Sequence, residues 1–335
     1  MSNHLKQPTN IFYLYLMVFS YFCICYTNIN RKTMHISYQI RWFAKKFLLL
    51  LALAFCMPAF GQHEQKPMSI EQRISNVLQN PKYVAVVAHR GDWRNWPENS
   101  IPAIESAINM GVDMVEIDVK LTRDSVLVLC HDWTLDRTTT GNGAIRDYTY
   151  EQLLAYDLKR GHGIAIPGLK IPTLKQALEL CKDRVLVNVD QGFDYYDQVL
   201  AITEELGMTN QVIIKSGWPS DKVAAVMKQH KTNMIYMPVV GISAGTDTTA
   251  FNKYFALKPP AFELCFGILD EKVKSLAGKV TASGAKVWVN TLWGSLCGNY
   301  DDDRAFVSPD PNSVYGPILD MGANIIQKPT DRSFS

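Results

Sequence analysis

The sequence predicts an α/β fold in which a parallel sheet is covered by helices. From Lys82 onward, short apolar runs of strand length alternate with longer stretches of helical periodicity. The runs expected as strands are 84–88, 114–119, 126–130, 185–189, 212–215, 234–239, 261–265, 286–290 and 324–327. The helices expected between them are 100–110, 173–180, 195–206, 219–230 and 270–283. The first of these is supported by Ser100-Ile101-Pro102, because serine caps a helix and proline favours its first turn.

Nine runs are one more than a TIM-like (β/α)8 barrel requires, and the second link explains the surplus. Only about six residues separate 114–119 from 126–130, whereas a parallel crossover needs roughly a dozen. We therefore expect a hairpin that turns near Arg123-Asp124-Ser125 and places Asp118 roughly opposite His131. The predicted fold is a distorted TIM-like barrel with an extra hairpin strand after the second barrel strand.

Residues 1–61 are predicted to be a targeting region and not part of the fold. Basic residues at 41, 45 and 46 precede the apolar run 47–60, and the small residues Ala59 and Gly61 suit signal-peptidase cleavage before Gln62. Met34 lies just upstream of this unit, so residues 1–33 are interpreted as a possible mis-called start. We expect an exported protein, periplasmic or secreted. The alternative is a membrane anchor, because the run 11–26 is close to the minimum spanning length of about 17 residues.

The remaining residues, 62–335, are predicted to form one domain of mildly acidic character. Lys and Arg number 34 against 32 Asp and Glu; six of the basic residues and none of the acidic ones lie in 1–61, so the remainder carries 28 − 32 = −4. This balance argues against a nucleic-acid partner, and it leaves the membrane to an uncleaved N-terminal segment. Four cysteines remain without a CxxC pair, so zinc is not expected and buried free thiols are. The oligomeric state is left open.

Polar residues collect where the predicted strands end, which is the functional face of such a barrel. The first strand ends in His89-Arg90-Gly91, which supplies a proton carrier, a bidentate anion binder and a flexible turn. A plain surface His and Arg fit this segment equally well when it is taken alone.

Glu116 and Asp118 stand two apart on one strand, so both carboxylates point to the same side. Two acids on an apolar strand are costly to bury unpaired, and a hard divalent cation such as calcium or magnesium is a natural partner. A salt bridge to Arg or Lys is the alternative. His131-Asp132 is expected to face this pair, Asp190 ends a later strand, and Lys215 ends the strand after that. For Lys215 a solvated surface position is the alternative. The segment Gly294–Gly316 is polar and acidic, which favours a surface loop.

The order and spacing of these clusters carry a resemblance to a known family. The pattern HRG…PENS…EIDV..T.D…HD..LDRTT.G.G…IPTL resembles the signature of the glycerophosphodiester phosphodiesterases, and the likeness extends from about Val84 to Gln327. It implies a distorted TIM barrel that hydrolyses small-molecule glycerophosphodiesters to glycerol phosphate and an alcohol with one Ca²⁺ or Mg²⁺ ion.

The resemblance also implies roles for individual residues. His89 and His131 would be the acid/base pair, Arg90 the phosphate clamp, and Glu116, Asp118 and Asp190 the metal ligands. Glu98 would support the His89 side of the site, and Asn99 would line it.

The chain departs from the family pattern at several positions. Asp190 stands where the family has Glu, and Gly192 stands where it has Lys; we expect Lys215 to replace that lysine in binding the phosphate. The aromatic lining of the strand around Trp288 is shifted, so Trp288 is expected to border a different alcohol pocket. The usual closing helix after the last strand is missing from the pattern; either the stretch 69–78 replaces it, or the sequence is truncated or in error at that end.

Two other functions remain compatible with these residues. One is a phospholipase-like or glycerophosphoinositol-directed phosphodiesterase, because related barrels share the two histidines and the anion clamp. The other is a relative that binds phosphodiesters without cleaving them, which Gly192 favours and the retention of His89, Arg90 and His131 opposes.

Overall fold

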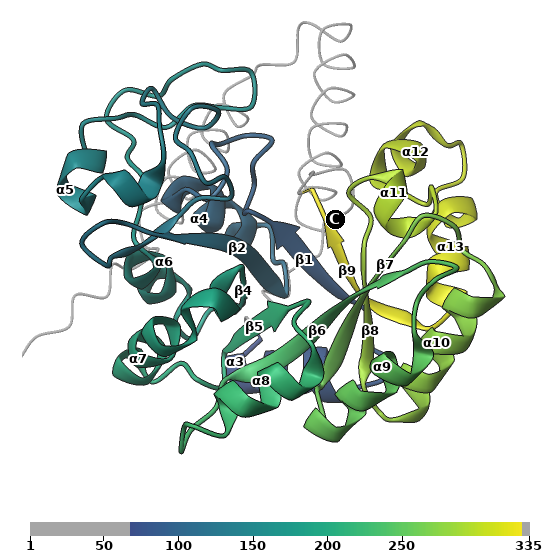
Figure 1. Cartoon of the computed structure of the whole chain (residues 1–335). Coiled ribbons are helices and arrows are strands. Elements are labelled where there is room, and N and C mark those ends of the chain that lie inside the picture. Colours follow the sequence, from purple (N-terminus) through teal and green to yellow (C-terminus); the bar gives the residue numbers. More distant parts are fainter. Residues whose placement is uncertain (1–67, 330–335) are drawn as a thin grey trace, which may run out of the picture. The chain divides into compact units, whose positions relative to one another are not determined.

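Eight parallel strands close into a barrel in the computed structural model, which describes residues 68–329 (Figure 1). The strands are β1 (Ala85–His89), β2 (Met114–Leu121), β4 (Leu186–Asp190), β5 (Val212–Ser216), β6 (Ile235–Ile242), β7 (Ala261–Phe266), β8 (Lys286–Asn290) and β9 (Ala323–Lys328). They pair in that order, and β9 pairs with β1 to complete the ring. The predicted TIM barrel is confirmed. The predicted targeting region, 1–61, lies outside the described residues.

The ninth strand, β3 (Leu127–Leu129), is bonded outside the barrel to β2 and runs antiparallel to it. The hairpin turns between residues 122 and 126, as the short link between the two strands predicted. The Thr122 N–H donates to the Val126 carbonyl at 3.0 Å. The Cys130 N–H donates to the Asp118 carbonyl at 3.1 Å. The predicted opposition of Asp118 and His131 is therefore correct to within one residue.

The expected helices lie between the strands and cover the barrel. They are α4 (Ile101–Asn109), α6 (Leu174–Cys181), α7 (Tyr196–Leu206), α8 (Ser220–Met227) and α10 (Glu271–Ala282). Ser100 caps α4 through its side chain, and a proline occupies the first turn, as the sequence indicated. Two short helices were not predicted, α5 (Tyr150–Leu153) and α9 (Thr248–Lys253).

The prediction of a surface loop over Gly294–Gly316 is wrong. The segment contains α11 (Gly294–Cys297) and α12 (Asp302–Val307) and enters α13 (Asn312–Asp320). Its acidic run starts a helix. The Asp301 carboxylate accepts the Arg304 N–H at 2.9 Å, and the next two aspartates occupy the first turn of α12. Negative charge at that position is favourable because it faces the positive end of the helix dipole.

The interior of the barrel changes from apolar to polar along the strands. Its lower part is a buried cluster to which Val87, Met114, Leu186, Ile213, Ala261, Trp288 and Ile325 belong. Two residues further along each of these strands stands a polar side chain: His89, Glu116, Asn188, Lys215, Glu263, Asn290 and Gln327. Residues two apart point to one side of a strand, so these polar groups form a layer above the apolar one. All seven are buried.

The amino-terminal opening of the barrel is closed by α3 (Ile70–Gln79), whose Ile70, Val77 and Leu78 belong to the interior cluster. A helix therefore forms over the expected stretch 69–78, and its replacement of the helix after the last strand stays a prediction. Asp113 ties the connection to the barrel, because its carboxylate accepts hydrogen bonds from the Tyr83 hydroxyl at 2.6 Å and the Val86 N–H at 2.9 Å. Among residues 68–329, no helix has the length and apolar composition to cross a membrane.

We expect Asp113→Ala to lower the free energy of unfolding by about 2–4 kcal/mol, because the Val86 N–H, the Tyr83 hydroxyl and the Arg73 guanidinium of α3 lose their acceptor. Chemical denaturation measures the loss. Asp320→Ala is the matched control, since that carboxylate is exposed at the end of α13. Equal stability of the two variants would contradict the proposed anchor.

Candidate active site

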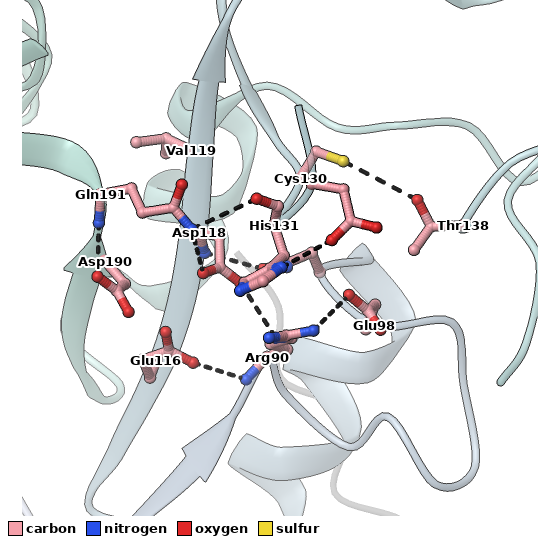
Figure 2. A network of polar contacts seen from close by, with 12 residues as sticks. Arg90, Glu98, Glu116, Asp118, Val119, Cys130, His131, Thr138, Asp190 and Gln191 are labelled. Carbon is pink, nitrogen blue, oxygen red and sulfur yellow. Dashed lines mark hydrogen bonds and ion pairs between the residues drawn. The ribbon is translucent and has the colours of Figure 1, made fainter. Parts of the chain in front are cut away.

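Three carboxylates meet at the carboxyl ends of β2 and β4. Glu116 and Asp118 come from β2, each 1% exposed, and Asp190 ends β4 opposite Asp118 in the strand register. One oxygen from each lies within 4.8 Å of the others. Figure 2 shows these side chains with Arg90 and His131 beside them. The resemblance had placed the three together as metal ligands, and the structure brings them together.

Burial disfavours the charged form of these carboxylates. Burial, with the charge of Asp118 next, raises the pKa of Glu116 well above its ordinary value, and burial also raises the pKa of Asp118. Oxygen ligands at this spacing suit a hard divalent cation, whose charge would relieve the crowding. The three residues therefore fit a metal site.

Arg90 links the carboxylates through an unusual backbone. Its φ of +54° turns the Arg90 N–H toward Glu116, which accepts it at 3.0 Å. Its side chain donates to Glu98 at 2.8 Å, and its Nε lies 3.3 Å from the Asp118 carboxylate. The following residue, Gly91, has a φ of +73°, and a Cβ there would lie 2.7 Å from the Ala103 carbonyl carbon. The predicted turn glycine is thus a steric requirement.

Asn99 fixes the direction of the Asp118 carboxylate. It lies in the left-handed region with a φ of +56°. Its side-chain amide donates to Asp118 at 2.8 Å, and its amide oxygen accepts the Asp118 N–H at 3.0 Å. Paired hydrogen bonds of this kind hold a carboxylate in one orientation.

His131 belongs to a chain of polar contacts that ends at Glu98. Its Nδ1 lies 2.7 Å from Asp132, which also accepts the Arg137 Nε–H at 2.7 Å. Arg137 donates in addition to both oxygens of Glu98, at 2.6 and 2.8 Å. The hydrogen bond from Arg137 is the largest influence that lowers the pKa of Asp132. Sequence reasoning missed Arg137, although it stands in the LDRTT segment that carried the resemblance.

His89 faces the site from the end of β1 and is 7% exposed. Burial, followed by the charges of Arg90 and Lys215, lowers its pKa well below the ordinary value, so the imidazole is neutral near pH 7. Its Nδ1 has no hydrogen-bond partner within residues 68–329. The ring meets the Trp293 indole edge-to-face, with 5.7 Å between the centroids.

A second group of charged residues, carried by β5 and β7, forms the floor of the site. Lys215 is buried, and its ammonium lies 3.2 Å from Asp190 and 3.0 Å from Glu263. Burial lowers the pKa of Lys215, but the carboxylates of Asp190 and Glu263 outweigh it and hold that pKa well above its ordinary value. Asn290 donates to Glu263 at 2.7 Å. The alternative of a solvated Lys215 is therefore wrong, and Glu263 is a site residue that sequence reasoning missed.

Trp288 lies below this floor and is fully buried. Its indole N–H donates to Asn290 at 2.7 Å and reaches Gln327 at 3.2 Å. In this position it supports the floor from beneath. Its expected contact with substrate stays a prediction.

With this geometry in view, comparison with known proteins identifies the family. A family model described as the glycerophosphoryl diester phosphodiesterase family matches residues 89–295, from the first histidine of the site into α11. The chain belongs to this family.

Curated members of the family align with part of the chain. A glycerophosphodiester phosphodiesterase of Caldanaerobacter subterraneus is 40% identical over 138 residues, which are 39% of this chain and 57% of that protein. Glycerophosphodiester phosphodiesterase 1 of Bos taurus is 39% identical over 137 residues, 40% of each chain. The chain thus spans about half the length of the curated relatives it matches.

Solved structures establish the fold. A glycerophosphoryl diester phosphodiesterase of Parabacteroides distasonis is 22% identical, with a TM-score of 0.63 over 78% of this chain and 88% of that one. A phosphodiesterase of Oleispira antarctica, in complex with the product sn-glycerol-3-phosphate, is 22% identical, with a TM-score of 0.54 over 73% of this chain and 92% of that one.

Gly192 stands where the family pattern has a lysine. A Cβ at that position would lie 2.7 Å from the Val189 Cγ1, so a lysine there would require a local shift. The cation beside Asp190 comes instead from Lys215, on the next strand of the barrel. Lys215, which the sequence proposed as the replacement cation, therefore lies beside Asp190.

We expect Glu116→Gln to stabilise the metal-free protein in EDTA at about pH 8, raising Tm by about 2–5 °C. The folded pKa of Glu116 is raised, so the folded state keeps a proton that the unfolded state has lost, and stability falls as pH rises through that interval. The difference should disappear near pH 4, where both states hold the proton. Thermal unfolding at both pH values measures it, with Glu271→Gln, an exposed carboxylate, as control. A lower Tm for Glu116→Gln at pH 8 would contradict this account.

Proposed function

We propose that this chain hydrolyses glycerophosphodiesters to glycerol 3-phosphate and an alcohol. The observation that carries the proposal is the assembly of His89, His131 and Arg90 around a carboxylate group at the functional face of a barrel that belongs to this family. The Oleispira phosphodiesterase, whose bound product is sn-glycerol-3-phosphate, has the same fold and supports this choice of substrate.

We propose Glu116, Asp118 and Asp190 as ligands of a divalent cation, Ca²⁺ or Mg²⁺. When bound, such an ion supplies positive charge for the non-bridging phosphate oxygens, where negative charge grows during displacement. Arg90 would add to this stabilisation, because its five N–H donors exceed the contacts it makes to Glu98 and Asp118. Asn99 would keep Asp118 in its binding orientation, and Lys215 would supply a further cation beside Asp190.

The two histidines are proposed to move protons in opposite directions. His89, neutral because its pKa is lowered, would accept the proton of the attacking hydroxyl. The ionised Asp132 can only accept hydrogen bonds, so the Nδ1 of His131 donates to it and the other ring nitrogen is left for the leaving oxygen. Arg137 would keep Asp132 in place and also hold Glu98 against Arg90. The carboxylate of Asp132 can thereby stabilise positive charge on His131.

Export also remains our proposal. Its support is the basic, apolar and small-residue order within residues 1–61, and a membrane anchor formed by the run 11–26 is the alternative.

The purified chain should release glycerol 3-phosphate from glycerophosphocholine, glycerophosphoethanolamine or glycerophosphoinositol in Ca²⁺ or Mg²⁺, and EDTA should abolish the release. Enzymatic measurement of glycerol 3-phosphate detects it. His89→Ala should lower kcat/KM by about 10²–10⁴-fold, the usual contribution of one acid/base group. Absence of release from all three diesters by a folded, metal-loaded protein would refute the proposal.

Lys215→Met should lower kcat/KM by about tenfold or more, because a cation beside Asp190 is lost from a site that binds a phosphate anion. Separate kcat and KM values show whether binding or turnover suffers. Lys228→Met, at an exposed position after α8, is the matched control. Circular dichroism should confirm that both variants fold, and unchanged kinetics of a folded Lys215→Met protein would dismiss the phosphate-binding role.

A further inference from the structure

Two exposed tryptophans border the site from different loops. Trp133 follows the His131-Asp132 pair and is 63% exposed, and Trp293 follows β8 and is 52% exposed. Trp293 meets the His89 ring. Trp133 lies under Lys120, whose ammonium is 4.7 Å from the centre of the ring and donates to Gln191, which in turn donates to Asp118 at 3.3 Å. Single exposed apolar side chains are normal, whereas two exposed indoles in contact with one site form a candidate binding surface for a ligand held there.

The backbone of each tryptophan is held by a hydrogen bond. The Trp133 carbonyl accepts the Ile145 N–H at 3.0 Å, within a small antiparallel contact between residues 134 and 144. The Trp293 carbonyl accepts the Leu296 N–H at 2.9 Å at the start of α11. Both tryptophans are therefore carried by segments whose backbone is held by hydrogen bonds, which favours a preformed binding surface.

Further exposed apolar side chains lie on the segments near Trp293. Ile268, Phe306 and Val307, on the segments that follow β7 and β8, are 74%, 66% and 77% exposed. Gly298, directly after α11, donates its N–H to Phe266 at 2.9 Å, so the segment after Trp293 lies against the one that carries Ile268. Figure 1 shows α11 and α12 at the end of the barrel to which the arrowheads of β1 and β9 point.

The charges around the indoles favour a neutral ligand group. Lys120 already occupies a position over the Trp133 ring, and Arg90 and Lys215 add positive charge within the site. Near Trp133, the carboxylates of Asp132 and Glu98 are both engaged by Arg137. Near Trp293, the carboxylate of Asp301 already accepts the Arg304 N–H at 2.9 Å. A cationic alcohol would therefore meet an aromatic face that holds a cation already and carboxylates that are already neutralised.

We propose that Trp133 and Trp293 bind the alcohol part of the substrate and select glycerophosphodiesters whose alcohol is uncharged and apolar. The inference rests on the proposed function, which fixes the other half of the substrate as glycerol phosphate. Both tryptophans are specificity-determining residues in this scheme, and the proton-transfer groups are unchanged.

The test is kcat/KM of the full chain on three diesters of glycerol 3-phosphate, with hexanol, ethanolamine and choline as the alcohol. The parent protein should favour the hexyl diester by about tenfold or more. Trp133→Ala and Trp293→Ala should each lose at least about tenfold on the hexyl diester and less than about threefold on the ethanolamine diester. The ratio between substrates is the measure, because a disturbed His89 would slow all three equally.

Two matched variants complete the experiment. Trp218→Ala removes an exposed indole that follows β5 and packs on Phe193, with 5.6 Å between the rings, so it should leave the preference intact. Trp293→Phe should keep most of it. A parent that prefers choline or ethanolamine, or tryptophan variants that slow all substrates alike, would overturn this inference alone. No turnover of any diester by the parent would overturn the proposed function and this inference with it.

Discussion

Glu116 and Asp118 are buried side by side on one strand, where an ionised carboxylate costs several kcal/mol unless other charges compensate. Many contacts in the site compensate for that cost. Arg90 adopts a left-handed backbone to offer both its N–H and its guanidinium, and Asn99, also left-handed, bonds Asp118 twice. Such backbone conformations are sparsely populated and persist where the surroundings determine them, which is common at functional sites. The strain of the first βα loop is thus linked to the charge on the second strand.

Two groups of charged residues lie on either side of Glu116 and Asp118. On one side, Arg137 joins Glu98 to Asp132, so the segment that carries His131 is tied to the loop that carries Arg90. On the other side, Lys215 joins Asp190 to Glu263 and so connects β4 with β7 across the floor. In each group one cation lies between two carboxylates. On the floor, where Lys215 and Glu263 are buried, the charges are tolerated because each has a partner of opposite sign.

What could be predicted from sequence depended on whether the information was local. The hairpin of β2 and β3 followed from a link too short for a parallel crossover, and the α4 cap followed from Ser100. The carboxylate pair followed from a spacing of two on one strand. Arg137 and Glu263 could not be found in that way, because their partners come from distant segments and meet only when the barrel closes. The acidic run before α12 misled for a related reason: the same residues suit a loop and a helix start, and only tertiary packing decides.

The two-residue repeat of the strands explains why the site lies where it does. Because inward side chains recur every second residue, one step along each strand changes the interior from apolar, at Val87 or Met114, to polar, at His89 or Glu116. The apolar layer and α3 exclude water from below, so the charges above it act in a poorly solvated setting. Their mutual forces are therefore stronger than on an open surface. A substitution that made the lower layer polar would weaken the site without touching any residue that contacts substrate.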